Sequence, residues 1–130
     1  MIAIDTNILV RLLTRDDYAQ AKRAAALFEH EEIFVAKTVL LETEWVLRFS
    51  YELNKPVILK ALKSAVGLPR VTVEDSPAVA EALDLFEAGV DFADALHLAS
   101  GRAAVQFATF DERLKKRADA SAPGRQVVLA

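Results

Sequence analysis

Four acidic side chains stand beside or inside apolar stretches of the sequence: Asp5, Glu42, Asp94 and Asp111. A carboxylate among apolar neighbours is costly unless it is paired, hydrogen-bonded or bound to a metal. Mg²⁺ and Mn²⁺ prefer oxygen ligands, and Mg²⁺ is typically held by one or two carboxylates together with water and substrate phosphate. The four acids together therefore predict a site for one or two such ions, of the kind that supports phosphodiester cleavage by a metal-activated water.

Glu42 is the acid whose helical position is most informative. Val39, Glu42, Val46 and Phe49 follow one another at i, i+3, i+7 and i+10. This spacing predicts that Glu42 lies on an apolar helix face, whereas Glu44 projects elsewhere and is expected to be exposed. A buried ion pair of Glu42 with a nearby cation, Arg48 or Lys37, is the alternative to a metal site.

The other acids have simpler structural explanations, because aspartate is common at the first position of helices. Asp5 could cap a helix that starts near Asn7, and Asp111 could cap the helix that follows it. Asp91 is better explained as a cap, or as a capping-box partner of Asp94, than as a metal ligand. The case for a site rests on the four acids taken together.

Short stretches rich in Ile, Val and Phe alternate with longer helical patterns along the whole chain. The predicted strands are residues 2–5, 33–36, 71–74, 105–109 and 126–129, and the predicted helices are residues 7–14, 17–31, 38–52, 56–67, 76–88, 92–103 and 111–119. Asn54-Lys-Pro56 and Ser76-Pro77 are typical helix starts. The alternation predicts an α/β fold with a parallel sheet of about five strands and helices on both faces.

Two of the acids follow predicted strands directly. Asp5 comes after the first strand, and Asp111 comes after the fourth. Open parallel sheets bind ligands outside the carboxyl ends of their strands, where the strand order reverses. Asp5 and Asp111 would meet there if the first and fourth strands are neighbours.

Composition indicates the general class of the protein but does not indicate its function. A chain of 130 residues, 53% hydrophobic and 27% charged, predicts one globular domain over residues 1–130. The absence of cysteine fits a cytoplasmic location, and neither a signal peptide nor a membrane span is expected. The net charge of −3 gives no support by itself to nucleic-acid binding, although bound metal would change the field that a polyanion meets.

Four ordered motifs resemble those of the PIN-domain family. They are Ile4-Asp-Thr-Asn-Ile-Leu-Val10, Leu41-Glu-Thr-Glu44, Asp91-Phe-Ala-Asp-Ala-Leu-His-Leu-Ala99 and Ala108-Thr-Phe-Asp111. The order of the motifs and the short chain most resemble the VapC-type toxins of toxin–antitoxin pairs. The resemblance spans essentially the whole chain and implies a three-layer PIN-like fold.

The resemblance also implies roles for individual residues. Asp5 and Asp94 would be the principal ligands of Mg²⁺ or Mn²⁺, with Glu42 and Asp111 completing the catalytic pocket directly or through water. Supporting roles would fall to Thr6, Asn7, Thr109 and Asp91. The implied activity is metal-dependent endoribonuclease cleavage, often of structured RNA, blocked by a cognate VapB-like antitoxin.

Basic residues near the acids are candidates for RNA contacts. Arg113, Lys115 and Lys116, in a run that ends at Arg117, follow Asp111 directly. They could hold RNA phosphates or could simply form a solvated helix face. Two further arginines on the first predicted helix, Arg11 and Arg15, could contact RNA or the acidic groups of an antitoxin.

The helix predicted over residues 38–52 is apolar nearly all the way round. Such a helix is either wholly buried or faces a partner on one side. Leu41 and Trp45 are the candidate partner face, for a homodimer or for an antitoxin helix, and burial in the core is the alternative. VapC-like proteins generally dimerise and assemble further with their antitoxins.

Two other classes of function compete with a ribonuclease. A phosphoryl-transfer α/β domain also places an aspartate after its first strand, but its phosphatase form needs a second acid where this chain has Asn7. A receiver form needs a lysine after the last strand, and none follows Val127. A non-catalytic binding module would keep the fold, but the complete set of four acids disfavours it.

Overall fold

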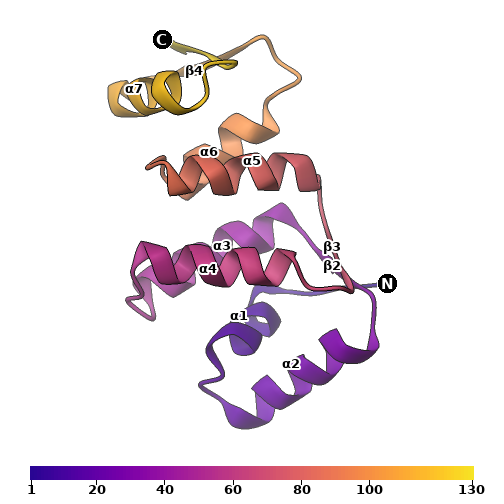
Figure 1. Cartoon of the computed structure of the whole chain (residues 1–130). Coiled ribbons are helices and arrows are strands. Elements are labelled where there is room, and N and C mark those ends of the chain that lie inside the picture. Colours follow the sequence, from indigo (N-terminus) through magenta and orange to yellow (C-terminus); the bar gives the residue numbers. More distant parts are fainter. The chain divides into compact units, whose positions relative to one another are not determined.

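The computed structural model describes all residues, 1–130, as five strands and seven helices (Figure 1). The contacts between residues divide the chain into two compact units, Met1–Ser76 and Pro77–Ala130. Each unit contains strands that pair in parallel and helices that follow them in the chain.

The sheet of the first unit has three strands, β1 (Ile2–Ala3), β2 (Ile33–Val35) and β3 (Val71–Val73). They pair in parallel in the order β1-β2-β3, with Ile2 opposite Ile33 and Ile33 opposite Val71. Ile33 and Val35 are buried on the central strand. β-branched side chains of this kind suit a strand that is covered by other elements.

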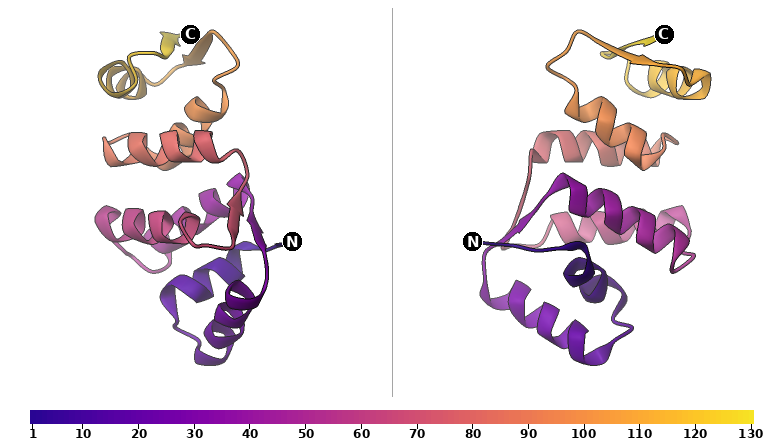
Figure 2. Two further views of the ribbon diagram at one scale, coloured as in Figure 1. Left: turned by 45° about the vertical axis from the view of Figure 1, so that its right-hand side comes forward. Right: turned by 180° about the vertical axis from the view of Figure 1, so that it is seen from behind.

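Four helices accompany this sheet, namely α1 (Thr6–Thr14), α2 (Tyr18–His30), α3 (Lys37–Phe49) and α4 (Lys55–Val66). α1 packs against α2 and α3, and α4 packs against α3 and β3 (Figures 1 and 2). The interior is aliphatic and includes Leu9, Val10, Leu40, Leu47, Ile58 and Leu62. Asn54 caps α4 by accepting from Val57 N at 3.2 Å, and a proline in the first turn of α4 provides the fixed φ of a helix start.

The second unit contains α5 (Ser76–Glu87, of which Ser76 belongs to the first unit), α6 (Phe92–Ser100), β4 (Gln106–Thr109), α7 (Glu112–Ser121) and β5 (Gln126–Leu129). β4 and β5 pair in parallel, with Gln106 opposite Gln126 and Thr109 opposite Leu129. α7 connects these strands and packs against both (Figure 2). The rings of Phe86 and Phe92 lie 5.3 Å apart in the apolar interior.

The corner between α5 and α6 is a glycine-dependent helix ending. Gly89 N donates to Phe86 O at 3.1 Å, and Val90 N donates to Leu85 O at 2.9 Å. Gly89 has φ +111°, which a residue with a Cβ adopts only under strain. These bonds make a Schellman motif with Gly89 just past the helix, and they turn the chain directly into the start of α6.

The predicted α/β class with five parallel strands is confirmed, and the helix boundaries agree to within three residues. The observed hydrogen bonds group the strands as β1-β2-β3 and β4-β5 rather than in one sheet. The adjacency of the first and fourth strands stays a prediction, and so does the single domain expected from the length and composition of the chain. None of the seven helices has the length and apolar character that a membrane crossing needs.

Candidate functional site

Asp5 lies at the end of the first-strand segment and caps α1. Its Oδ1 accepts a hydrogen bond from Ile8 N at 3.1 Å, and its extended backbone is typical of a cap. The residue is exposed, and its second carboxylate oxygen has no protein partner. Asp5 therefore fixes its carboxylate with one oxygen and presents the other to solvent.

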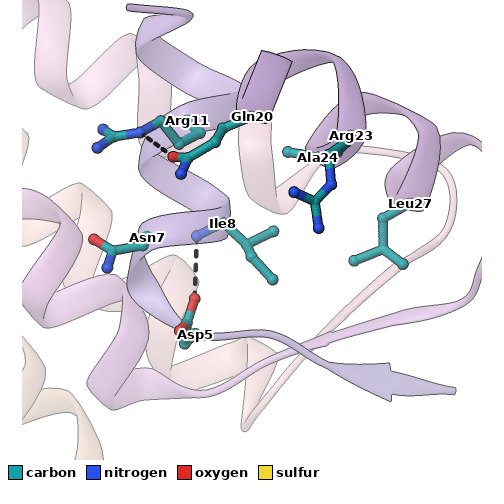
Figure 3. Close-up of a pocket in the computed structure, with 8 residues that line it drawn as sticks. All are labelled: Asp5, Asn7, Ile8, Arg11, Gln20, Arg23, Ala24 and Leu27. Carbon is teal, nitrogen blue, oxygen red and sulfur yellow. Dashed lines mark hydrogen bonds between the residues drawn. The ribbon is translucent and has the colours of Figure 1, made fainter. Parts of the chain in front are cut away.

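A pocket between α1 and α2 opens beside Asp5 (Figure 3). Its lining residues are Asp5, Asn7, Ile8 and Arg11 from the α1 side and Gln20, Arg23, Ala24 and Leu27 from α2. Arg11 donates to Gln20 at 2.8 Å, to Tyr51 at 2.9 Å and to Asp16 at 3.3 Å. The guanidinium of Arg11 therefore connects α1 to α2 and to Tyr51, which follows α3.

Glu42 lies on an exposed part of α3 and accepts a short hydrogen bond from the hydroxyl of Thr6. Thr6 is the buried first residue of α1, next to Asp5. The hydroxyl thus connects the start of α1 to the Glu42 carboxylate. One Glu42 oxygen remains without a protein partner.

The predicted orientation of α3 is wrong. Glu44 is only 1% exposed and its carboxylate lies 2.9 Å from Arg48, whereas Glu42 is exposed. The buried face of α3 is Leu40, Thr43, Glu44 and Leu47. The helix is apolar on both faces, so the i, i+3, i+7 spacing alone could not decide which face is buried. Neither cation considered as an ion-pair partner of Glu42 is paired with it. Arg48 pairs with Glu44, and Lys37 pairs with Asp75.

Asp94 lies in the first turn of α6, partly buried, and its carboxylate has no hydrogen-bond or ion-pair partner. Asp91 caps the same helix by accepting from Asp94 N at 3.4 Å, as predicted. Burial raises the pKa of Asp94 above its usual range, and the neighbouring charges of Asp91 and Asp111 raise it further, while His97 partly offsets them. The carboxylate of Asp94 therefore carries a desolvation cost in the folded chain.

Asp111 caps α7 with a single oxygen. Its Oδ1 accepts from Arg113 N at 2.9 Å and from Leu114 N at 3.0 Å. Thr109 Oγ1 accepts from the backbone N–H of Asp111 at 3.0 Å, which orients the residue between β4 and α7. Its second oxygen has no protein partner, so capping and cation binding are compatible at this residue.

Asp94 and Asp111 line one pocket of the second unit, together with Gly89, Val90, Asp91, Arg113, Leu114 and Arg117. The guanidinium of neither arginine has an ion pair or a hydrogen bond. The two lysines of the same basic run differ from these arginines. Lys115 is bound to Asp119 at 2.8 Å and to Val127 O at 3.2 Å, and Lys116 is exposed outside the pocket.

Arg15 is not on α1 as predicted but follows its last residue, with φ 55°.

The predicted partner face on α3 is aromatic and open to solvent. Trp45 is 53% exposed, and its ring centre lies 5.1 Å from that of Phe49. The Arg48 guanidinium lies 4.6 Å from the Phe49 ring centre. Leu41 is half-buried. Trp45 is therefore not buried in the core of the first unit, and a partner at Leu41 and Trp45 stays a prediction.

Neither unit by itself gathers three His, Asp or Glu side chains in an arrangement that would hold a metal. The first unit contains Asp5 and Glu42, and Thr6, the residue after Asp5, donates a hydrogen bond to Glu42. The second unit contains Asp94 and Asp111, which line one pocket. Joint action of the two pairs stays a prediction from their sequence motifs. The donors are carboxylate oxygens, which are the ligand type that Mg²⁺ and Mn²⁺ prefer.

Two arginines of these pockets are not identified by sequence reasoning. Arg117 belongs to the basic run but not to the predicted RNA contacts, and Arg23 lies in none of the four motifs. Gly89 does carry a signal, because a glycine just past a helix commonly ends it with a positive φ. Sequence does not show that α7 turns Arg117 toward that glycine.

The family model of the PIN domain matches residues 2–120, so the chain belongs to the PIN-domain family. PIN domains are typically nucleases, and the family generally uses metal ions. A solved structure similar to this chain is the crystal structure of VapBC2 from Rickettsia felis bound to a DNA fragment from their promoter. It has 15% sequence identity and a TM-score of 0.40, and the match covers 98% of this chain and 96% of that one. No curated protein matches the chain.

Proposed function

We propose that this PIN domain is a metal-dependent endoribonuclease. The observation that carries the proposal is the carboxylate of Asp94, partly buried without any hydrogen-bonding partner, beside Asp111 with an uncommitted oxygen. A protein tolerates such a carboxylate when a cation satisfies it in the working state. Family membership supplies the class of activity that such a cation would serve.

The residues present fit a divalent cation of the Mg²⁺ or Mn²⁺ type. Asp94 and Asp111 would hold it from the second unit, and Asp5 and Glu42 from the first, in direct contact or through water. When bound, such an ion lowers the pKa of a coordinated water and stabilises the leaving oxygen of a phosphodiester. Thr6 would keep the Glu42 carboxylate oriented, and Thr109 would keep Asp111 in place. The proposal that both pairs serve one site rests on the four ordered motifs.

The test is Asp94→Asn, with Asp84→Asn as a matched control. Asp84 is an exposed aspartate on α5 of the same unit, outside the pocket. We expect Asp94→Asn to abolish Mn²⁺-dependent cleavage of RNA and to weaken Mn²⁺ binding in calorimetry, with the circular-dichroism spectrum unchanged. Asp84→Asn should behave like the wild type. Full Mn²⁺-dependent cleavage by Asp94→Asn would contradict the assignment.

We further propose that the nuclease is the toxin of a type II toxin–antitoxin pair. This rests on the resemblance of the four motifs to those of VapC-type toxins. A VapB-like antitoxin would be the partner, and a homodimer would be the free form. Expression together with the product of a small adjoining gene should abolish growth arrest and yield a stable complex. Growth unaffected by the nuclease alone would contradict the toxin role without contradicting cleavage.

A further inference from the structure

The guanidinium of Arg117 lies against the glycine that ends α5. A Cβ built on Gly89 would stand 2.4 Å from Nη1 of Arg117, which is closer than any non-bonded contact allows. The missing side chain therefore leaves the space in which the guanidinium sits. The positive φ of Gly89 independently disfavours any other residue there.

Arg113 stands one helical turn before Arg117 on α7, so the two side chains share a helix face. Both line the pocket that holds Asp94 and Asp111, and neither is neutralised by an ion pair. The pocket thus has an acidic part and a separate cationic part. An unpaired guanidinium beside a carboxylate pocket offers a planar pair of donors to an anion that approaches the carboxylates.

We propose that Arg117, seated over Gly89, binds a phosphate of the RNA strand and positions it beside the acidic part of the pocket, with Arg113 as a second donor. The proposal rests on the proposed ribonuclease function, and it assigns this task to two members of the basic run. A guanidinium binds two phosphate oxygens through parallel N–H···O bonds, which fixes the strand as well as attracting it. Lys115 is engaged by Asp119 and Val127, and Lys116 lies outside the pocket.

RNA binding in EDTA tests the proposal without requiring cleavage. The probe is a fluorescent single-stranded oligouridylate, titrated by anisotropy at several salt concentrations. The variants are Arg117→Gln, Arg117→Lys and Lys116→Gln, and Lys60→Gln is the charge-matched control on an exposed part of α4. We expect Arg117→Gln to weaken binding about 10-fold and to reduce the salt slope by about 0.7, the value for one phosphate contact on a single strand.

Arg117→Lys should keep most of the salt slope but recover affinity only in part, because a lysine cannot make the two parallel bonds. In cleavage assays with Mn²⁺, Arg117→Gln should mainly raise KM. Equal losses in Arg117→Gln and Lys116→Gln, unchanged binding by Arg117→Gln, or no RNA binding by the wild type would overturn the proposal. If wild-type cleavage fails but metal-free binding depends on Arg117, the ribonuclease assignment fails and the RNA site stands.

Discussion

Asp111 performs two separable tasks, and one pair of substitutions distinguishes them. Its Oδ1 accepts from two backbone N–H groups in the first turn of α7, while the other oxygen is available to a cation. Asparagine is as good a helix cap as aspartate, whereas alanine has no acceptor. Asp111→Asn should therefore remove the proposed ligand and keep the cap, and Asp111→Ala should remove both.

The size of the effect follows from the exposure of Asp111. Because the residue is exposed, water can solvate the two N–H groups that alanine leaves unbonded, so the loss should be about 1 kcal/mol, the middle of the range for helix caps. Asparagine loses only the interaction of the charge with the helix dipole, about 0.3 kcal/mol at an exposed position. With a urea m-value of about 1–3 kcal/mol/M, alanine should lower the unfolding midpoint by about 0.3–1 M.

The assays are urea denaturation in EDTA and Mn²⁺ titration by calorimetry, for both variants and the wild type. We expect a clear midpoint shift for Asp111→Ala, a shift near the error for Asp111→Asn, and weaker Mn²⁺ binding in both. Equal destabilisation by the two variants would refute the capping argument. Wild-type Mn²⁺ affinity in Asp111→Asn would refute the ligand role.

Three further outcomes follow from the structure. The pKa of Asp94 is raised in the folded state, so its ionisation destabilises the fold as pH rises through that pKa. Asp94→Asn should therefore raise the Tm of the metal-free protein at pH 7. The gain in Tm should vanish below pH 3.8, the ordinary pKa of an aspartate, where Asp94 is protonated in both the folded and the unfolded state. The hydrogen bond from Tyr51 is the largest cause of the lowered pKa of Asp16, with Thr14 and Arg11 contributing, so Tyr51→Phe should raise that pKa in an NMR titration. The stability that Asp16 contributes is fully present above pH 3.8 and is lost as pH falls through its folded-state pKa, so in Tyr51→Phe this contribution should be smaller and its loss complete at a higher pH. Phe92→Ala should lower the free energy of unfolding by about 3–5 kcal/mol in chemical denaturation, because the ring is buried against Phe86. A loss below about 1 kcal/mol would contradict this expectation and show that the neighbouring side chains fill the cavity left by the ring.

Local signals explain why the elements could be predicted well. Prolines, glycines and capping residues mark most boundaries, and Asn54 and Asp111 act at the helix starts where their types predict. The α/β alternation follows from these elements without any knowledge of strand order. Strand order itself depends on long-range pairing, which no local pattern of residues determines.

The failure at α3 has a specific cause. Two faces of that helix are apolar enough to be buried, so the helical period alone does not decide between Glu42 and Glu44. The chain buries Glu44, because Arg48 one turn later supplies a cation at 2.9 Å. The carboxylate of Glu42 is held not by burial but by a hydrogen bond from the Thr6 hydroxyl on α1. A contact between residues 36 positions apart is not visible in a helical period.

The one-oxygen caps at Asp5 and Asp111 have an evolutionary consequence. A single nucleotide change converts an aspartate codon to an asparagine codon, and asparagine would keep both helix starts intact. Loss of the proposed metal ligands would then leave a folded protein that still presents the same surfaces to partners. Chains of this kind can therefore give rise to stably folded copies without the proposed metal ligands in one mutational step. Under the proposed toxin function, such copies would compete for the antitoxin without cleaving RNA.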